Sequence, residues 1–351
     1  MLKERQGEYC VGGGVSSHSL FGEIISAENI FTAWREFTKG KSSRIDVQAF
    51  ALHLEDNVFD LHDNLAAGTY HHGGYKQFIV SDPKRRIIHK ASVRDRLLHH
   101  AIVRVLEPLF DRQFIFDSWS CRKGKGSHGA VERFHDFAWR LSRNATRAVW
   151  VLKLDVRKFF ASVDRDILVS LLIRRFHDPG LLWLLRDVVF SFSPGLPIGN
   201  LTSQLFANVY LHELDVFVKH ELRAPAYLRY SDDFVLLDCQ PELLQRHLTS
   251  IESFLGERLR LSLHDDKKLL TPFHRGVDFL GYVCFPFFRV LRTTTRRRLL
   301  RRVRLRNLGS YQGMLVWCRS ELVRRQVNEK LSSCNDRWWH TFLHSDSYPQ
   351  R

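Results

Sequence analysis

Cysteine is scarce and scattered in this sequence of 351 residues. No Cys-x-x-Cys pair occurs, so the sequence indicates neither a zinc site nor a disulfide framework. Long apolar runs are also missing, and none approaches the roughly 20 residues that span a bilayer. The N-terminus lacks the charged, apolar and small-residue order of a signal peptide. We therefore expect a cytoplasmic protein with no membrane partner and with six reduced cysteines: Cys10, Cys121, Cys239, Cys284, Cys318 and Cys334.

Acidic residues are too few to balance the basic ones. Lysine and arginine total 53 against 38 aspartate and glutamate residues, which gives a formal net charge of +15. Such an excess favours a polyanionic partner such as nucleic acid or, less specifically, a membrane surface, and net charge alone does not choose between them. Hydrophobic residues make up 44% of the chain, which is enough for a packed core. The glycines of "CVGGGVSSHS" lack the Gly-Lys-Ser/Thr of a phosphate-binding loop, and we expect residues 1–25 to be a mobile segment.

Hydrophobic periodicity predicts helices and one hairpin in the first part of the chain. One helix follows Ser26 or Asn29 as N-cap, and a second covers residues 47–68. Residues 73–90 alternate like a hairpin with Asp82-Pro83 at its turn, and the next helix has Ser92 as N-cap. The loop "SWSCRKGKGSHG" carries Arg122, Lys123 and Lys125 ahead of a further helix. Exposed amides at such a helix start suit a phosphate or RNA backbone, although an ordinary exposed loop explains them equally well.

Carboxylates stand at the ends of two predicted strands. The apolar run "AVWVLKLDV" predicts a buried strand that ends at Asp155, and Asp164 is expected to cap the next helix. In "YLRYSDDFVLLDC" the adjacent Asp232 and Asp233 lie at a hairpin tip. Two neighbouring carboxylates repel each other unless a cation neutralises them, although a solvated turn is the simpler explanation for an isolated pair. If these strands are neighbours, three carboxylates converge, as two-metal phosphoryl transfer requires.

Arginine is concentrated near the C-terminus. Residues 291–308 carry eight arginines and no acids on an expected helix capped near Thr295. A solvated helix face is one interpretation, but so many like charges repel each other without a polyanion beside them. We favour contact with nucleic acid, and "VDFLGYVCF" just before this stretch predicts a short strand pair.

Seven segments, in order, resemble the motifs of reverse transcriptases. They are "PKRRIIHKASVRDRLLHHAI", "SWSCRKGKGSHGAV", "KLDVRKFFASVD", "GLPIGNLTSQLFANVYLHELD", "YSDDFVLL", "LSLHDDKK" and "VDFLGY". The resemblance implies an α+β right-hand polymerase fold: fingers at residues 26–148, a palm of antiparallel strands backed by helices at 149–285, and a small arginine-rich helical thumb at 286–351. The implied activity is RNA-directed DNA synthesis with two Mg²⁺ ions, for which Mn²⁺ is a possible substitute.

Carried over position by position, the resemblance assigns roles to residues of this sequence. Asp155, Asp232 and Asp233 are the implied catalytic residues, and Val156 joins them in holding the metals. The other implied contacts form three groups: for dNTP, Lys84, Arg86, Phe159, Phe160, Ile198, Gly199 and Lys267; for the primer grip, Phe279, Leu280, Gly281 and Tyr282; and for nucleic acid, Arg122, Lys123, Lys125, Ser203, Gln204, Arg296, Arg297 and Arg301. Phe160 matches the steric gate against ribose, whereas Phe159 is also explained by core packing. Because Lys268 is adjacent to Lys267, the match of Lys267 to the lysine of the family motif is open by one residue.

One departure from the common pattern points to a subfamily. The loop reads Pro197-Ile198-Gly199, then Ser203-Gln204, where most reverse transcriptases have Pro-Gln-Gly and Ser-Pro. This pattern is similar to that of diversity-generating retroelements, which copy a template RNA with errors at adenines for mutagenic retrohoming. The implied partners are template RNA, the RNA/cDNA duplex, dNTPs and a small basic oligomeric accessory variability protein, in a bacterial, archaeal or phage-encoded setting.

Two other functions compete with this one. A retron-type, defence-associated or group II intron-like reverse transcriptase shares the chemistry, although the short region after the palm disfavours an intron maturase domain. A catalytically inactive RNA-binding protein on the same scaffold is a different class. The retained Asp155, Asp232 and Asp233 argue against it, because clustered carboxylates have no structural benefit of their own.

Overall fold

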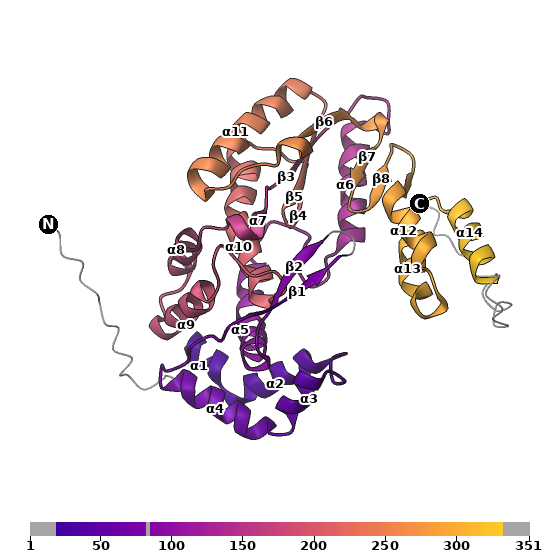
Figure 1. Ribbon diagram of the computed structural model, residues 1–351. Helices are drawn as coiled ribbons and strands as arrows, with labels where there is room; N and C mark the ends of the chain where they lie inside the picture. The colour runs from indigo at the N-terminus through magenta and orange to yellow at the C-terminus, as the bar shows by residue number, and fades with distance from the viewer. Residues whose placement is uncertain (1–18, 82–84, 333–351) are drawn as a thin grey trace. The chain divides into compact units, whose positions relative to one another are not determined.

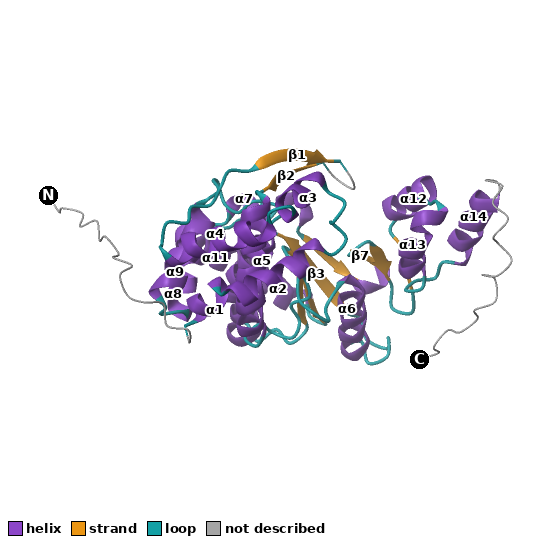
Figure 2. Ribbon diagram, turned by 90° about the horizontal axis from the view of Figure 1, so that it is seen from below, coloured by secondary structure: helices purple, strands orange, loops and turns teal. Residues whose placement is uncertain are grey.

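The computed structural model describes residues 19–81 and 85–332, in which helices are mixed with three sheets (Figures 1 and 2). The strand pairs whose register is defined are antiparallel, so the predicted α+β class is confirmed. Within these two ranges, no helix is both long and apolar enough to cross a bilayer.

The chain forms two compact units that do not follow one another along the sequence. Among the described residues, the first unit contains 19–81, 85–125, 154–234 and 246–268, and the second contains 126–153, 235–245 and 269–332. This grouping crosses the boundaries expected for fingers, palm and thumb. Those boundaries stay a prediction.

Helices α1 (Leu20–Ile25), α2 (Ala27–Thr38), α4 (Leu54–Ala66) and α5 (Val93–Asp111) pack together in the first unit (Figure 1). The predicted N-caps are confirmed, because Ser26 accepts from the amide of Asn29 and Ser92 from that of Asp95. The expectation of a mobile segment up to residue 25 is wrong for residues 20–25. These residues form α1, because Ser19 caps it and its apolar side chains are buried. Residues 1–18 lie outside the described ranges.

The single helix expected over residues 47–68 is divided in two. Helix α3 (Ile45–Ala51) ends before Leu52, and α4 begins after His53, whose backbone is not helical (φ −126°, ψ 46°). The side-chain amide of Asn57 donates to the carbonyl of Phe50 at 3.0 Å. Hydrophobic periodicity continues across this break, which is why the sequence pattern did not show it.

The predicted hairpin is formed by β1 (Lys76–Val80) and β2 (Arg86–Lys90), with Phe78 opposite Ile88. Every residue of β1 is exposed, and so is Arg86 at the start of β2. Lys84 and the expected Asp82-Pro83 turn lie outside the described residues.

Four helices of the first unit follow β3 (Trp150–Asp155) in the chain: α7 (Phe159–Ser162), α8 (Arg165–Arg175), α9 (Pro179–Phe190) and α10 (Leu201–Val216). A π-helical turn, η1 (Phe217–Glu221), continues α10. Asp164 caps α8 as predicted, since its carboxylate accepts from the amides of Asp166 and Ile167. Helix α10 is buried along most of its length and begins at Leu201, so Thr202 and Ser203 lie in the helix rather than in the preceding loop.

The central sheet has the strand order β4-β5-β3-β6. Its strands are β3 (Trp150–Asp155), β4 (Tyr227–Tyr230), β5 (Asp233–Asp238) and β6 (Leu269–Pro272), and α11 (Pro241–Leu259) connects β5 to the segment before β6. Strand β5 is buried at its four inner positions and β3 at Val151, Leu152 and Leu154, which agrees with the apolar sequence that predicted them.

The second unit contains α6 (Ser127–Leu141) and a meander of β7 (Val277–Phe279), β8 (Tyr282–Cys284) and β9 (Arg289–Leu291). The ring of Phe134 on α6 lies 5.5 Å from that of Phe279. Helices α12 (Thr293–Arg302), α13 (Leu308–Leu315) and α14 (Glu321–Ser332) complete the unit. The prediction of an N-cap near Thr295 is wrong: α12 follows Arg292, and Thr295 is buried in its first turn.

Candidate active site

Asp155 and Asp232 are held next to each other by backbone hydrogen bonds. The amide of Val156, the residue after Asp155, donates to the carbonyl of Asp232 at 3.1 Å. On the other side, the amide of His264 donates to the carbonyl of Asp155 at 2.9 Å. These bonds place the end of β3 against the turn between β4 and β5, within the first unit. The two segments therefore meet as the sequence predicted.

The charges at this point interact strongly. The Lys267 ammonium donates to a carboxylate oxygen of Asp155 at 2.5 Å. Burial raises the pKa of the Asp232 carboxyl, and the negative charge of Asp155 adds to this rise. Lys268 instead pairs with Glu252 and Asp265, so the geometry favours Lys267 as the lysine of this site.

The predicted convergence of three carboxylates is not seen as a preformed cluster. Among the described side chains, no group of three His, Cys, Asp or Glu residues is placed to hold a metal ion. The Lys267 ammonium already neutralises Asp155, and like charges oppose a closer approach of Asp232 and Asp233. The close pair is Asp155 and Asp232, with Asp233 next in the chain at the start of β5.

This pair fits a divalent cation. Hard cations such as Mg²⁺ take carboxylate oxygens, and one or two protein carboxylates are enough when a substrate phosphate supplies the rest. Burial, and with it the charge of Asp155, raises the pKa of Asp232, and a bound cation would favour the ionised carboxylate. Asp155 and Asp232 are the residues that would hold it, with Asp233 and Val156 adjacent.

Phe159 and Phe160 differ in exposure. Phe159 is 2% exposed and its side chain packs in the core near Tyr210. Core packing therefore explains Phe159, and its contact with dNTP stays a prediction. Phe160 is half-buried, and its carbonyl accepts from the amide of Leu196 at 2.7 Å. The close approach requires glycine at 195, where φ is +67° and a Cβ atom would lie 2.2 Å from the Phe160 carbonyl oxygen.

The loop with Ile198 and Gly199 is bound to the hairpin as well. The amide of His89 on β2 donates to the carbonyl of Ile198 at 2.9 Å. Gly199 has φ +117°, and a Cβ atom there would lie 2.8 Å from the Ile88 side chain. Ile198 is half-buried and Gln204 is exposed, whereas Ser203 is 2% exposed. The burial of Ser203 leaves Gln204 as the accessible member of the predicted pair.

Comparison with known proteins identifies the chain. Residues 81–284 match the model of the family "Reverse transcriptase (RNA-dependent DNA polymerase)". The chain belongs to the reverse transcriptase family. It is 24% identical over 310 residues to protein YkfC of Escherichia coli (strain K12), an alignment that covers 73% of this chain and 78% of YkfC. It is 23% identical over 357 residues to the group II intron-encoded protein LtrA of Lactococcus lactis subsp. cremoris, which covers 79% of this chain and 57% of LtrA.

A solved structure shows the same fold. Telomerase from Candida albicans, in complex with a TWJ fragment of telomeric RNA, has a TM-score of 0.52 and 13% identity, covering 80% of this chain and 58% of that one. The predicted right-hand polymerase fold is therefore confirmed. This reverse transcriptase spans less than two thirds of the length of LtrA and of the telomerase chain.

The basic loop of this reverse transcriptase is less available to nucleic acid than its sequence indicates. The Arg122 side chain is 7% exposed, and its guanidinium binds the Asp111 carboxylate and the carbonyls of Ile115 and Ser118. These bonds give Arg122 a structural role, and its contact with RNA stays a prediction. Lys125 donates to the Phe116 carbonyl at 2.9 Å, and the side chain of Lys123 is 84% exposed.

The predicted primer-grip residues form a tight turn in the second unit of the reverse transcriptase. Phe279 pairs with Tyr282 across β7 and β8, and Leu280 (φ 48°) and Gly281 (φ 93°) form the two-residue connection. Phe279 and Tyr282 are buried, and the Tyr282 hydroxyl donates to the Met314 carbonyl at 3.1 Å. The Leu280-Gly281 backbone is therefore the part of this motif that a primer can approach.

The arginines of α12 point largely to solvent. Arg297 and Arg301 are exposed, and Arg296 donates to the Gln326 side chain at 3.0 Å. The helix ends at Arg302, so the arginine-rich stretch of the reverse transcriptase is not one continuous helix.

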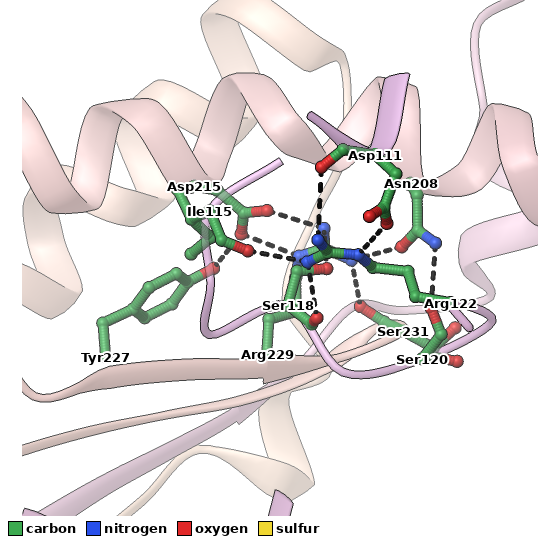
Figure 3. A network of polar contacts seen from close by, with 10 residues as sticks. All are labelled: Asp111, Ile115, Ser118, Ser120, Arg122, Asn208, Asp215, Tyr227, Arg229 and Ser231. Carbon is green, nitrogen blue, oxygen red and sulfur yellow. Dashed lines mark hydrogen bonds and ion pairs between the residues drawn. The ribbon is translucent and has the colours of Figure 1, made fainter. Parts of the chain in front are cut away.

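Arg229 lies close to the site and was not predicted from the sequence. This arginine is fully buried on β4, three positions before Asp232, and Figure 3 shows it at the centre of a polar network. A charged residue at a core position of an apolar strand was the available sequence signal, because a buried charge needs a partner. Its partner, Asp215, is on α10, and no sequence pattern links the two.

Proposed function

We propose that this protein is an RNA-directed DNA polymerase that makes cDNA by nucleotidyl transfer with two divalent ions, Mg²⁺ being the expected metal. The observation that carries the proposal is that backbone hydrogen bonds hold Asp155 and Asp232 next to each other, in a chain of the reverse transcriptase family. When bound, the metals activate the primer hydroxyl and neutralise the triphosphate.

The protein's own residues provide binding and orientation. Asp155, Asp232 and Asp233 supply oxygen ligands, and Lys267 supplies a positive charge next to Asp155 for the triphosphate. Phe160 offers a half-exposed ring as the barrier to a ribose 2′-hydroxyl, and Arg86 an exposed guanidinium on the hairpin. The template RNA and the RNA/cDNA duplex are the expected polyanions for a chain with net charge +15.

The more specific proposal is an error-prone enzyme of a diversity-generating retroelement. It rests on Ile198, Gly199 and the Ser203-Gln204 pair. An isoleucine in place of glutamine lacks the amide that would make polar contacts with the nascent base pair, which lowers discrimination. This proposal includes errors at template adenines and a small basic accessory variability protein as partner.

A group II intron-like function is the second candidate, because LtrA is among the relatives of this chain. Base-by-base sequencing of the cDNA separates the two candidates. Errors concentrated opposite template adenines support the diversifying enzyme, and accurate cDNA supports the intron-like or retron-like one.

The first test is primer extension on a defined RNA template with Mg²⁺ and dNTPs. We expect synthesis by the unmodified protein and none by Asp232→Asn, whose folding and RNA affinity should be retained. Asp56→Asn, at an exposed position of α4, is the matched control and should behave like the unmodified protein. Full synthesis by Asp232→Asn contradicts the role of the carboxylate pair. RNA binding without any synthesis, with accessory protein and cognate RNA supplied, supports the inactive RNA-binding class.

The second test is Ile198→Gln. Because the backbone of Ile198 is held by the His89 amide, the side chain can be exchanged without moving the loop. We expect fewer errors at template adenines in the sequenced cDNA. An unchanged error spectrum contradicts the proposed role of this position.

A further inference from the structure

An ion pair with no exposure to water lies at the centre of the polar network around Arg229. The side chains of Arg229 and Asp215 are both 0% exposed. The guanidinium binds both carboxylate oxygens, with Nε to Oδ1 at 2.7 Å and Nη2 to Oδ2 at 2.6 Å. The Tyr227 hydroxyl donates to Asp215 Oδ1 at 2.7 Å. Arg229 thus has a fixed position and orientation, set by a bidentate contact.

The remaining donors of Arg229 reach the turn that carries Asp232. Nη1 donates to the carbonyl of Ser231 at 3.1 Å and to Asn208 Oδ1 at 3.2 Å. Ser231 directly precedes Asp232 and has φ +57°, a left-handed conformation that is uncommon for a residue other than glycine. Such a conformation persists where surrounding contacts enforce it. The bond from Arg229 is one of these contacts (Figure 3).

Backbone bonds fix β4 itself at the same point. The amide of Arg229 donates to the Asp117 carbonyl, and its carbonyl accepts from the Trp119 amide, both at 2.9 Å. Nη2 also donates to the Ser118 hydroxyl at 3.1 Å. The side-chain amide of Asn208 donates to the Ser120 carbonyl at 2.9 Å. The segment 117–120, β4 and α10 are therefore joined through one guanidinium.

We propose that Arg229, held by Asp215, is a positioning residue that fixes the Ser231-Asp232 turn so that the Asp232 carboxylate faces Asp155. The proposal rests on the proposed function for its consequence in synthesis. A buried ion pair is weak evidence for a role in stability, because well-packed apolar residues of similar volume often replace such a pair without loss. Apolar residues cannot donate to the Ser231 carbonyl. Stability and positioning can therefore be separated by experiment.

The test compares the unmodified protein with the triple variant Arg229→Met, Asp215→Leu and Tyr227→Phe. This variant removes the whole ion-pair cluster, so no charge is left buried alone. The matched control is Arg174→Met with Glu213→Leu, an exposed ion pair on α8 and α10. Three quantities are measured on each protein: unfolding by urea, hydrogen exchange of the Val156 amide, and Mn²⁺ binding by electron paramagnetic resonance.

We expect the triple variant to unfold at a similar urea concentration. The Val156 amide, which donates to the Asp232 carbonyl, should exchange about tenfold faster, because its acceptor is no longer held in place. Mn²⁺ affinity should fall about 10- to 100-fold, the range typical of residues that orient metal ligands. In primer extension, the Mg²⁺ concentration for half-maximal rate should rise by a similar factor. The surface control should change none of these values.

Unchanged exchange at Val156 together with unchanged Mn²⁺ affinity, in a folded triple variant, overturns the proposal. If the triple variant does not fold, Arg229→Lys provides the test, since it keeps the charge but not the bidentate geometry. The proposal is overturned equally if a folded Arg229→Lys protein has the same Val156 amide exchange rate and the same Mn²⁺ affinity as the unmodified protein. Hydrogen exchange requires no synthesis, so absence of cDNA from the unmodified protein contradicts the proposed function without affecting this measurement.

Discussion

Arginine has opposite surroundings in two regions of this reverse transcriptase. On β4, Arg229 is fully buried and binds a carboxylate, a side-chain amide, a hydroxyl and a backbone carbonyl. On α12, Arg297 and Arg301 are exposed to solvent, in a stretch of eight arginines that contains no acidic residue. The arginines of both regions contribute equally, one charge each, to the formal net charge of +15.

The difference shows that the number of arginines in a segment does not predict the role of each arginine. An arginine that is buried with a carboxylate orients protein atoms, because its donors are used inside the fold. An exposed arginine has donors available for phosphate and acts through long-range charge. Three sets of variants are ordered below by the size of the expected effect, and the first two test this division.

The largest effect is expected from Asp215→Ala. This change leaves the Arg229 charge buried without its carboxylate, which should lower the free energy of unfolding by about 3–5 kcal/mol. Glu213→Ala, two residues earlier on the same helix, breaks the exposed pair with Arg174 and should cost about 1 kcal/mol or less. Urea unfolding measures both values. Equal losses would remove the distinction between the two environments.

A smaller effect is expected on nucleic-acid binding. The triple variant Arg296→Gln, Arg297→Gln and Arg301→Gln should weaken RNA binding and reduce the slope of log K against log salt by roughly 2–3, or 0.7–0.9 for each lost phosphate contact. A control set has glutamine at the exposed Arg35, Arg112 and Arg258. Fluorescence anisotropy at several salt concentrations provides the slopes. A change of the same size in the control set would show that total charge, and not α12, determines affinity.

The smallest effect concerns His100, a half-buried base. Burial, together with the charge of Lys41, lowers the pKa of His100 to about 4 from its ordinary 6.5. Between these pH values the unfolded chain takes up a proton that the folded protein excludes, so stability is retained above pH 6.5 and falls as the pH drops towards 4.

The variant His100→Gln should therefore show a flatter dependence of unfolding free energy on pH between 6.5 and 4. His177→Gln, at an exposed position, is the control and should keep the original dependence. Urea unfolding at three pH values in this window measures the slopes. A slope that is identical in both variants would mean that burial of His100 contributes nothing to acid sensitivity.

Local sequence patterns predicted the parts of the fold that depend on local physics. Ser92 and Asp164 were identified as N-caps because a side-chain oxygen before an apolar periodic run satisfies free helix amides. The apolar run ending at Asp155 was identified as a strand for a similar reason. The meeting of Asp155 with the Asp232 turn was predicted from chemistry, because a metal ion shared by carboxylates at both places would compensate their charges.

The features that were missed depend on partners far away in the chain. Arg122 has the sequence context of an exposed basic loop, but Asp111 and two carbonyls surround its guanidinium. The Arg229 network joins α10 to β4 and to segment 117–120, and nothing in any one segment indicates the other two. Long-range pairing of this kind is set by packing, which a pattern of spacing does not describe.

The loop with Ile198 has a further consequence for how such an enzyme can change. Its backbone is attached at two places, to Phe160 through the Leu196 amide and to β2 through the His89 amide. The shape of the loop is thus determined by main-chain bonds, and the identity of the side chain at position 198 is independent of that shape. Under the proposed role of Ile198, selectivity for the templating base would change by single codon substitutions at this position while the rest of the fold stays intact.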